Sequence, residues 1–182
     1  MSWSRRRLIR AAGVIAGASA AGILRVAAAE KEEGSGRIVL ENLHTPDSLD
    51  IVFRRGDYFV PDALSSIEAL LRDHRTGTHH PIDPRLMDYL YDVAHLAGVE
   101  PVFTVISGYR SPQTNEMLHE RSSAVSSHSL HMEGRAIDVR LAGVGCARLA
   151  EEALSTKRGG VGYYNNSDFV HLDTGRFRSW RG

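Results

Sequence analysis

The chain has 182 residues, of which 42% are hydrophobic and 24% charged, which is typical of a globular protein rather than a disordered or fibrous one. Its 22 basic and 22 acidic residues balance, but residues 1–29 hold five of the arginines and no acid. The remainder therefore carries 17 basic against 22 acidic residues, which argues against a nucleic-acid partner, because that function favours a basic face.

Residues 1–29 have the pattern of an export signal. The basic stretch SRRRLIR precedes a weakly apolar segment, residues 11–24, and a run of three alanines that suits a cleavage site. The apolar segment is shorter than the roughly 20 residues of a membrane span, so no stable span is expected. Paired Arg5 and Arg6 favour a twin-arginine signal over an ordinary secretory peptide. We expect the mature chain in the periplasm, with residues 30–36 as a flexible leader.

The rest of the chain, residues 37–182, is predicted to form a single domain. In chain order, the expected elements are strands at 37–43 and 49–53, helices at 60–75 and 83–99, a strand at 101–106, a short helix at 116–121, a strand at 135–141, a helix at 146–156, and strands at 159–164 and 169–174. The first two strands should form a hairpin. This order predicts an α+β fold, with a small, mainly antiparallel sheet and helices packed on one side.

Asp138 is the most unusual residue of this pattern, because it lies between two apolar residues of a predicted strand. An ionised carboxylate there is costly unless a cation or hydrogen-bond donors meet it. His131 precedes it by seven residues, a distance of about 10 Å along a helix, so one helix could not bring both to one ion. A loop that turns at Gly134 could do so.

The last predicted strand offers a second histidine. Strand alternation places His171 and Asp173 on one face of the segment FVHLD. Together with His131 and Asp138, His171 would complete two imidazoles and one carboxylate, the make-up of a catalytic zinc site with a fourth position for water. The alternative is that both histidines are structural and Asp138 caps a turn.

A family resemblance favours the metal site. The pattern SxHxxGxAxD at residues 129–138, with the late His171, resembles the signature of zinc peptidases related to the D-Ala-D-Ala carboxypeptidases and the hedgehog fold. The segments ISGYRS, GGVGYY and FVHLDTG resemble more closely the murein endopeptidase K group of exported bacterial enzymes, over about residues 37–181. The resemblance implies one Zn²⁺ per chain, bound by His131, Asp138 and His171, and peptidoglycan peptide stems as the substrate. It also favours the linkage between two diaminopimelates.

Two further roles are predicted for this site. Arg110, in SGYRS, would bind a substrate carboxylate or the negative charge on the scissile carbonyl oxygen, unless it is a surface salt-bridge residue. Relatives often carry an acid three residues before the last histidine, and Asp168 occupies that position as the favoured general base. Asp173 is the alternative base, or it orients an imidazole. Strict strand alternation would put Asp168 on the wrong face unless it still belongs to the preceding turn.

The leading hypothesis is therefore an exported, monomeric zinc metallopeptidase that cleaves peptidoglycan cross-links with metal-activated water. A carboxypeptidase that releases a terminal D-amino acid is one alternative. A non-catalytic wall-binding module with structural zinc is another, although such sites usually have four protein ligands. The only cysteine, Cys146, is expected to be a small buried helix residue rather than a nucleophile. His128 is expected in a loop or substrate groove, and Trp180 could cover the sheet end or line that groove.

Overall fold

The structure, a computed structural model, describes residues 34–122 and 125–182. The expected export signal lies outside the described residues. Within them the chain forms one sheet of eight strands: β1 Ser35–Asn42, β2 Ser48–Arg55, β3 Tyr58–Phe59, β4 Val102–Ser107, β5 Ala136–Leu141, β6 Gly160–Tyr164, β7 Phe169–Asp173 and β8 Arg178–Arg181. The described helices are α1 Pro61–Leu70, α2 Pro84–Leu96, α3 Pro112–Arg121, α4 Cys146–Ser155 and the 3₁₀ helix η1 Leu130–Glu133.

The strands follow the order β3-β2-β1-β4-β5-β7-β6-β8 across the sheet. Neighbours are antiparallel except for the pairs β1–β4 and β6–β8, which are parallel. The α+β class, the mainly antiparallel sheet and the first hairpin are thus confirmed. Ser35 and Gly36, expected in the leader, already pair with β2.

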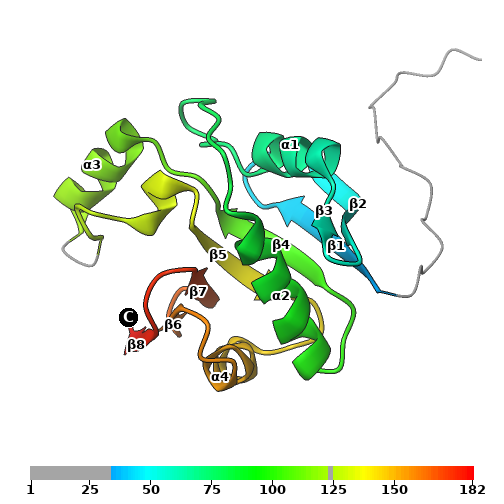
Figure 1. Ribbon diagram of the computed structural model, residues 1–182. Helices are drawn as coiled ribbons and strands as arrows, with labels where there is room; N and C mark the ends of the chain where they lie inside the picture. Colours follow the sequence, from blue (N-terminus) through cyan, green and yellow to red (C-terminus); the bar gives the residue numbers. More distant parts are fainter. Residues whose placement is uncertain (1–33, 123–124) are drawn as a thin grey trace, which may run out of the picture.

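Apolar residues on one face of the sheet form the core with the helices. Helix α1 packs on β2, α2 on β1 and β5, and α4 on β5, β6 and β7, so these three helices cover the same face (Figure 1). Alternation along β5 gives this face Ile137, Val139 and Leu141, all of which are buried. The residues between them, including Asp138, point to the face that these helices do not cover.

Several elements differ from the expectation, and the short strand β3 and the helix η1 were not predicted. Helix α3 begins at Pro112, four residues early, because the Ser111 side chain accepts a hydrogen bond from Thr114 N at 3.2 Å and proline suits the first helical position. The strand β8 was not predicted at all. None of the helices in the described part of the chain has the length and apolarity that a membrane span requires.

Candidate metal centre

The loop between His131 and Asp138 turns where the sequence predicted. The Ser129 side chain caps η1 by accepting a hydrogen bond from His131 N. Gly134 ends η1 with a φ of 64°, a left-handed conformation that favours glycine. A Cβ there would also run into the backbone carbonyl of Pro81. The chain therefore leaves η1 at Gly134 and enters β5.

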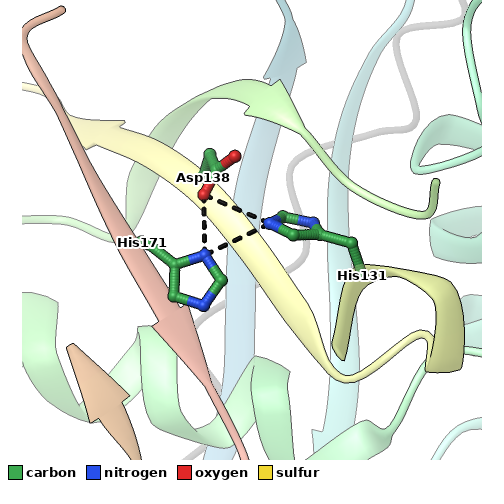
Figure 2. Close-up of side chains that lie close together, drawn as sticks. All are labelled: His131, Asp138 and His171. Carbon is green, nitrogen blue, oxygen red and sulfur yellow. Dashed lines mark hydrogen bonds and ion pairs between the residues drawn. The ribbon is translucent and has the colours of Figure 1, made fainter. Parts of the chain in front are cut away.

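The three predicted ligands lie together on the uncovered face of the sheet (Figure 2). Asp138 on β5 is directly opposite His171 on β7, and His131 reaches them from η1. Asp138 Oδ1 lies 2.9 Å from His171 Nδ1 and 3.3 Å from His131 Nε2, and the two nitrogens are 3.2 Å apart. Ligands of a tetrahedral zinc ion with bonds of 2.0–2.1 Å are roughly 3.3 Å apart, so the triangle has the size of one face of such a tetrahedron.

The outer nitrogen of each imidazole is already in use. His131 Nδ1 lies 2.7 Å from the Gly108 carbonyl, and His171 Nε2 lies 3.1 Å from Asp173 Oδ2. Both partners only accept hydrogen bonds, so these two nitrogens carry the protons. Neutral imidazoles then direct the lone pairs of His131 Nε2 and His171 Nδ1 toward Asp138 Oδ1. Three acceptors at such short distances repel one another unless a proton or a metal ion lies among them, so this donor set can hold a metal ion.

Burial strengthens the same conclusion, because His131, Asp138 and His171 are only 3%, 6% and 8% exposed. Burial lowers the pKa of His131, which keeps that imidazole neutral. It opposes ionisation of Asp138, but the two histidines outweigh this and hold the carboxyl pKa below its usual range. Burial also lowers the pKa of His171, but hydrogen bonds with Asp138 and Asp173 raise it to about 8. The site therefore combines a negative charge with surroundings that favour a cation.

A cavity of about 630 Å³ opens over the ligand triangle. Its walls include Arg110, His128, Tyr164, Arg178 and Trp180, in addition to the three ligands. Trp180 thus lines a groove, and its ring lies 5.1 Å from that of His171. His128 also lines the groove and does not belong to the ligand cluster. Substrate of considerable size can reach the ligands from this side.

Arg110 lies beside the ligands with part of its hydrogen-bonding capacity unused. Its side chain is 12% exposed, and Nη2 lies 3.7 Å from Asp138 Oδ2. Nη1 donates to Asn115 Oδ1 at 3.3 Å, whereas Nε is buried without a partner. Burial lowers the pKa of Arg110, although arginine stays charged at neutral pH. A buried, partly unpartnered guanidinium on the cavity wall is suited to an anionic group of a substrate.

The two candidate bases are placed very differently. Asp168 has a φ of 50° in the turn before β7, its side chain is 71% exposed, and its carboxylate lies 3.3 Å from Arg140 Nε. It does not line the cavity. Asp173 is fully buried, accepts from His171 and forms a two-point ion pair with Arg178 at 2.7 and 3.0 Å. The geometry thus brings Asp173 to the ligands as an orienting group and does not bring Asp168.

Three contributors to this site escaped the sequence analysis: the Gly108 carbonyl, Tyr164 and Arg178. The first is a backbone group and leaves no trace in the residue types. The other two occur in segments, GGVGYY and RSW, whose place beside His171 depends on strand pairing. Cys146 is buried, and burial raises the pKa of its thiol to about 11, which does not suit a nucleophile.

An α+β sheet with two histidines and an aspartate converging under an open cavity is typical of metal-dependent enzymes, among them hydrolases. The sequence profile of the family described as peptidoglycan L,D-endopeptidase MepK matches residues 30–180. The chain therefore belongs to this peptidase family, and the resemblance seen in its motifs is confirmed.

Individual relatives agree with the family match. The peptidoglycan L,D-endopeptidase MepK of Escherichia coli strain K12 is 39% identical over 179 residues, which cover 97% of each chain. The protein from Shigella flexneri with the same name matches equally well. The probable peptidoglycan L,D-endopeptidase MepK of Haemophilus influenzae is 38% identical over 146 residues, covering 80% of this chain and 78% of its own. The similarity thus spans the ligand loop, the sheet and the cavity.

Proposed function

We propose that this protein is an extracytoplasmic zinc peptidase that cleaves peptide cross-links of peptidoglycan. The observation that carries the proposal is the convergence of three ligand atoms, with the outer nitrogen of each imidazole held by its own acceptor. The names of its relatives supply the substrate, peptidoglycan, and the class of bond, an L,D cross-link. Residues 1–29, with their export pattern, would deliver the chain to the periplasm, where that substrate lies.

Zinc is the metal that this donor set suits best. Two imidazole nitrogens and one carboxylate oxygen are typical zinc ligands, and a three-ligand set is typical of catalytic rather than structural sites. When bound, zinc supplies a Lewis acid that polarises the scissile carbonyl and activates water for attack. All three ligands come from one chain, so a monomer suffices for activity.

The residues around the ligands have distinct proposed tasks. Asp173 positions His171, because its two oxygens already accept hydrogen bonds from His171, Arg178 and two backbone amides. Arg110 lines the cavity and binds the substrate through its guanidinium, either at a carboxylate of the stem peptide or at the scissile carbonyl oxygen. Asp168 would have to leave Arg140 before it could take a proton at the ligands. Asp168→Asn therefore tests that assignment, and unchanged kcat would remove it.

The substrate can be narrowed further. Arg110 on the cavity wall suits a peptide that carries carboxylates, as cross-linked stem peptides do. Among such cross-links we propose the linkage between two diaminopimelates.

The decisive experiment is a muropeptide mass profile of purified sacculi before and after digestion by the zinc-loaded protein. Conversion of cross-linked dimers to monomers, abolished by His171→Ala, is the expected result. His95→Ala is a matched control, since His95 lies on helix α2, away from the cavity, and its ring bonds to the Tyr91 carbonyl one turn earlier.

Two other outcomes would replace the proposal. Loss of a single terminal residue from monomers would identify a carboxypeptidase. A protein with stoichiometric zinc that leaves every cross-link intact is not an endopeptidase. Wall binding that His171→Ala leaves unchanged would then identify the non-catalytic module.

A further inference from the structure

The uncovered face of β6 and β8 carries an aromatic wall that none of the roles above uses. Tyr164 stacks on Phe169 with ring centroids 4.5 Å apart and an interplanar angle of 18°. Trp180, on β8, is paired with Gly162 on β6, and a Cβ at Gly162 would lie 2.5 Å from the indole ring. The missing side chain at Gly162 therefore lets the indole lie flat on the sheet beside His171.

One hydrogen bond fixes the orientation of the Tyr164 hydroxyl. Trp180 Nε1 donates to the Tyr164 hydroxyl oxygen at 3.0 Å. An indole N–H can only donate, so the hydroxyl must accept here and directs its own proton elsewhere. That proton has no acceptor among the described residues, and Tyr164 lines the cavity. Accepting one hydrogen bond also makes a hydroxyl a stronger donor of the next.

The strand order places this donor across the ligands from Arg110. The sheet runs β4-β5-β7-β6-β8, with Asp138 on β5 and His171 on β7 at its centre. Arg110 follows β4 on one side, and Tyr164 ends β6 on the other. Both line the cavity that opens over the ligands, so a peptide bound there would have a donor on each flank.

We infer that Tyr164 is a further catalytic residue, which donates a hydrogen bond to the scissile carbonyl oxygen as negative charge develops on it. Trp180 is a positioning residue, which holds the Tyr164 hydroxyl in the orientation that leaves its proton free. The inference rests on the proposed function, because it assigns these roles within that reaction. A donor aimed at developing charge stabilises the transition state more than the bound substrate, so it should affect kcat more than KM.

The test compares Tyr164→Phe, Trp180→Phe and the double variant, with a purified cross-linked muropeptide dimer as substrate. Tyr164→Phe keeps the stack on Phe169 and loses the hydroxyl, and we expect kcat to fall about 100- to 1,000-fold with little change in KM. Binding of a phosphinic pseudopeptide that mimics the tetrahedral transition state, measured by calorimetry, should weaken by a similar factor. Trp180→Phe should lower kcat less than Tyr164→Phe does.

The double variant separates positioning from simple packing. If Trp180 acts through Tyr164, adding Trp180→Phe to Tyr164→Phe should cause no further fall in kcat. Tyr163→Phe is the matched control, because Tyr163 packs against the core on the opposite face and its hydroxyl bonds to Asn165 Oδ1 at 2.8 Å. It should keep wild-type kcat.

Several outcomes would overturn the inference. A wild-type kcat in Tyr164→Phe would do so. A loss of zinc content as large as the loss of kcat would also do so, since Tyr164 would then be structural. If Tyr164→Phe fails to fold, two measurements on other variants decide. The inference is excluded if the kcat losses of Trp180→Phe and Arg110→Lys are additive and if Trp180→Phe binds the analogue as tightly as the wild type does. A wild-type protein inactive on the dimer would instead refute the proposed function.

Discussion

Replacing Asp173 by Asn should weaken metal binding without touching a metal ligand. Asp173 Oδ1 accepts from the Gly160 and Gly175 amides and from Arg178 Nη1, at 2.8–3.0 Å. Oδ2 accepts from His171 Nε2 and Arg178 Nη2. An asparagine must place its NH₂ group against one of these two sets of donors.

The donor count decides how the new side-chain amide would orient. If its NH₂ replaced Oδ1, three donors would lose their acceptor, whereas only two would do so if it replaced Oδ2. The second orientation is favoured, because each buried donor left without a partner costs about 1–3 kcal/mol. The NH₂ would then face His171 Nε2, which would have to accept. The imidazole proton would move to Nδ1, the nitrogen that faces Asp138 and the metal position.

The expected loss follows from this change of tautomer. Removing the partner of a ligating histidine typically weakens metal binding by about 10- to 100-fold, which is about 1.4–2.7 kcal/mol. Competition with a chromogenic chelator measures the zinc affinity directly. Urea unfolding in the presence of chelator measures stability separately, and should show an additional loss because Arg178 Nη2 loses its carboxylate acceptor, whereas Nη1 keeps the side-chain oxygen and the Arg176 carbonyl.

Asp50→Asn provides the matched control. Asp50 forms a comparable two-point pair with Arg37, at 2.8 and 2.6 Å, between β1 and β2. The same chemical change there should leave zinc affinity unchanged. Wild-type zinc affinity in Asp173→Asn would refute the reasoning, because it would mean that Asp173 does not set the tautomer of His171.

Three other predictions concern metal, backbone and pH. Chelation should lower the thermal midpoint and added zinc should restore it, since a ligand at 100 times its Kd stabilises the folded state by about 2.7 kcal/mol; an unchanged midpoint in scanning fluorimetry would contradict binding by the folded state. Gly134→Ala should lower the free energy of unfolding in urea by at least about 1 kcal/mol more than Gly143→Ala, because the added methyl overlaps the Pro81 carbonyl only at Gly134, while both positions share a positive φ; equal losses would exclude the contact with Pro81. Burial raises the pKa of Asp73, but hydrogen bonds from Ser111 and its neighbours outweigh this and hold it well below the usual range. Asp73→Asn should therefore lower the free energy of unfolding in urea by about 2 kcal/mol at pH 7. The loss should become progressively smaller below about pH 4, where protonation removes the same interaction from the wild type, and a loss independent of pH would contradict this.

The parts of the site that the sequence predicted depend on local rules. Strand alternation places His171 and Asp173 on one face, and a left-handed glycine is needed to bring His131 back toward Asp138. Both rules act within about ten residues, so they can be read without knowing which strands pair. The same is true of the helix starts at Pro61 and Pro84.

The parts that it missed depend on pairing between distant segments. Nothing in the four polar and aromatic residues of β8 indicates that they pair in parallel with β6, yet this pairing brings Trp180 to His171. The rule that favoured Asp168 counts residues back from His171. The turn before β7 interrupts the alternation, with a φ of 50° at Asp168, and Arg140 pairs with the side chain. A count along the chain cannot include such a partner.

The register of the sheet explains why an acid can occupy an apolar strand. Asp138 and His171 are directly opposite on antiparallel strands, where Cβ atoms are about 4.5–5.5 Å apart, so their side chains can share one ion. On the other side of Asp138, the pairing of β4 with β5 is irregular between Val105 and Ser107. Such irregularities release the chain from a sheet and often occur beside active sites.

This irregularity has a direct consequence for the third ligand. The chain leaves β4 at Gly108, whose carbonyl accepts from His131 Nδ1, while Arg110 N donates to the His131 carbonyl. His131 is therefore held from its backbone and from its ring by the segment that the irregularity releases. A regular β4 would continue past Asp138 and would leave His131 without these partners. The irregular pairing of β4 with β5 therefore positions His131 beside Asp138. The interactions of Asp138 with this ligand and with His171 offset the cost of burying its carboxylate.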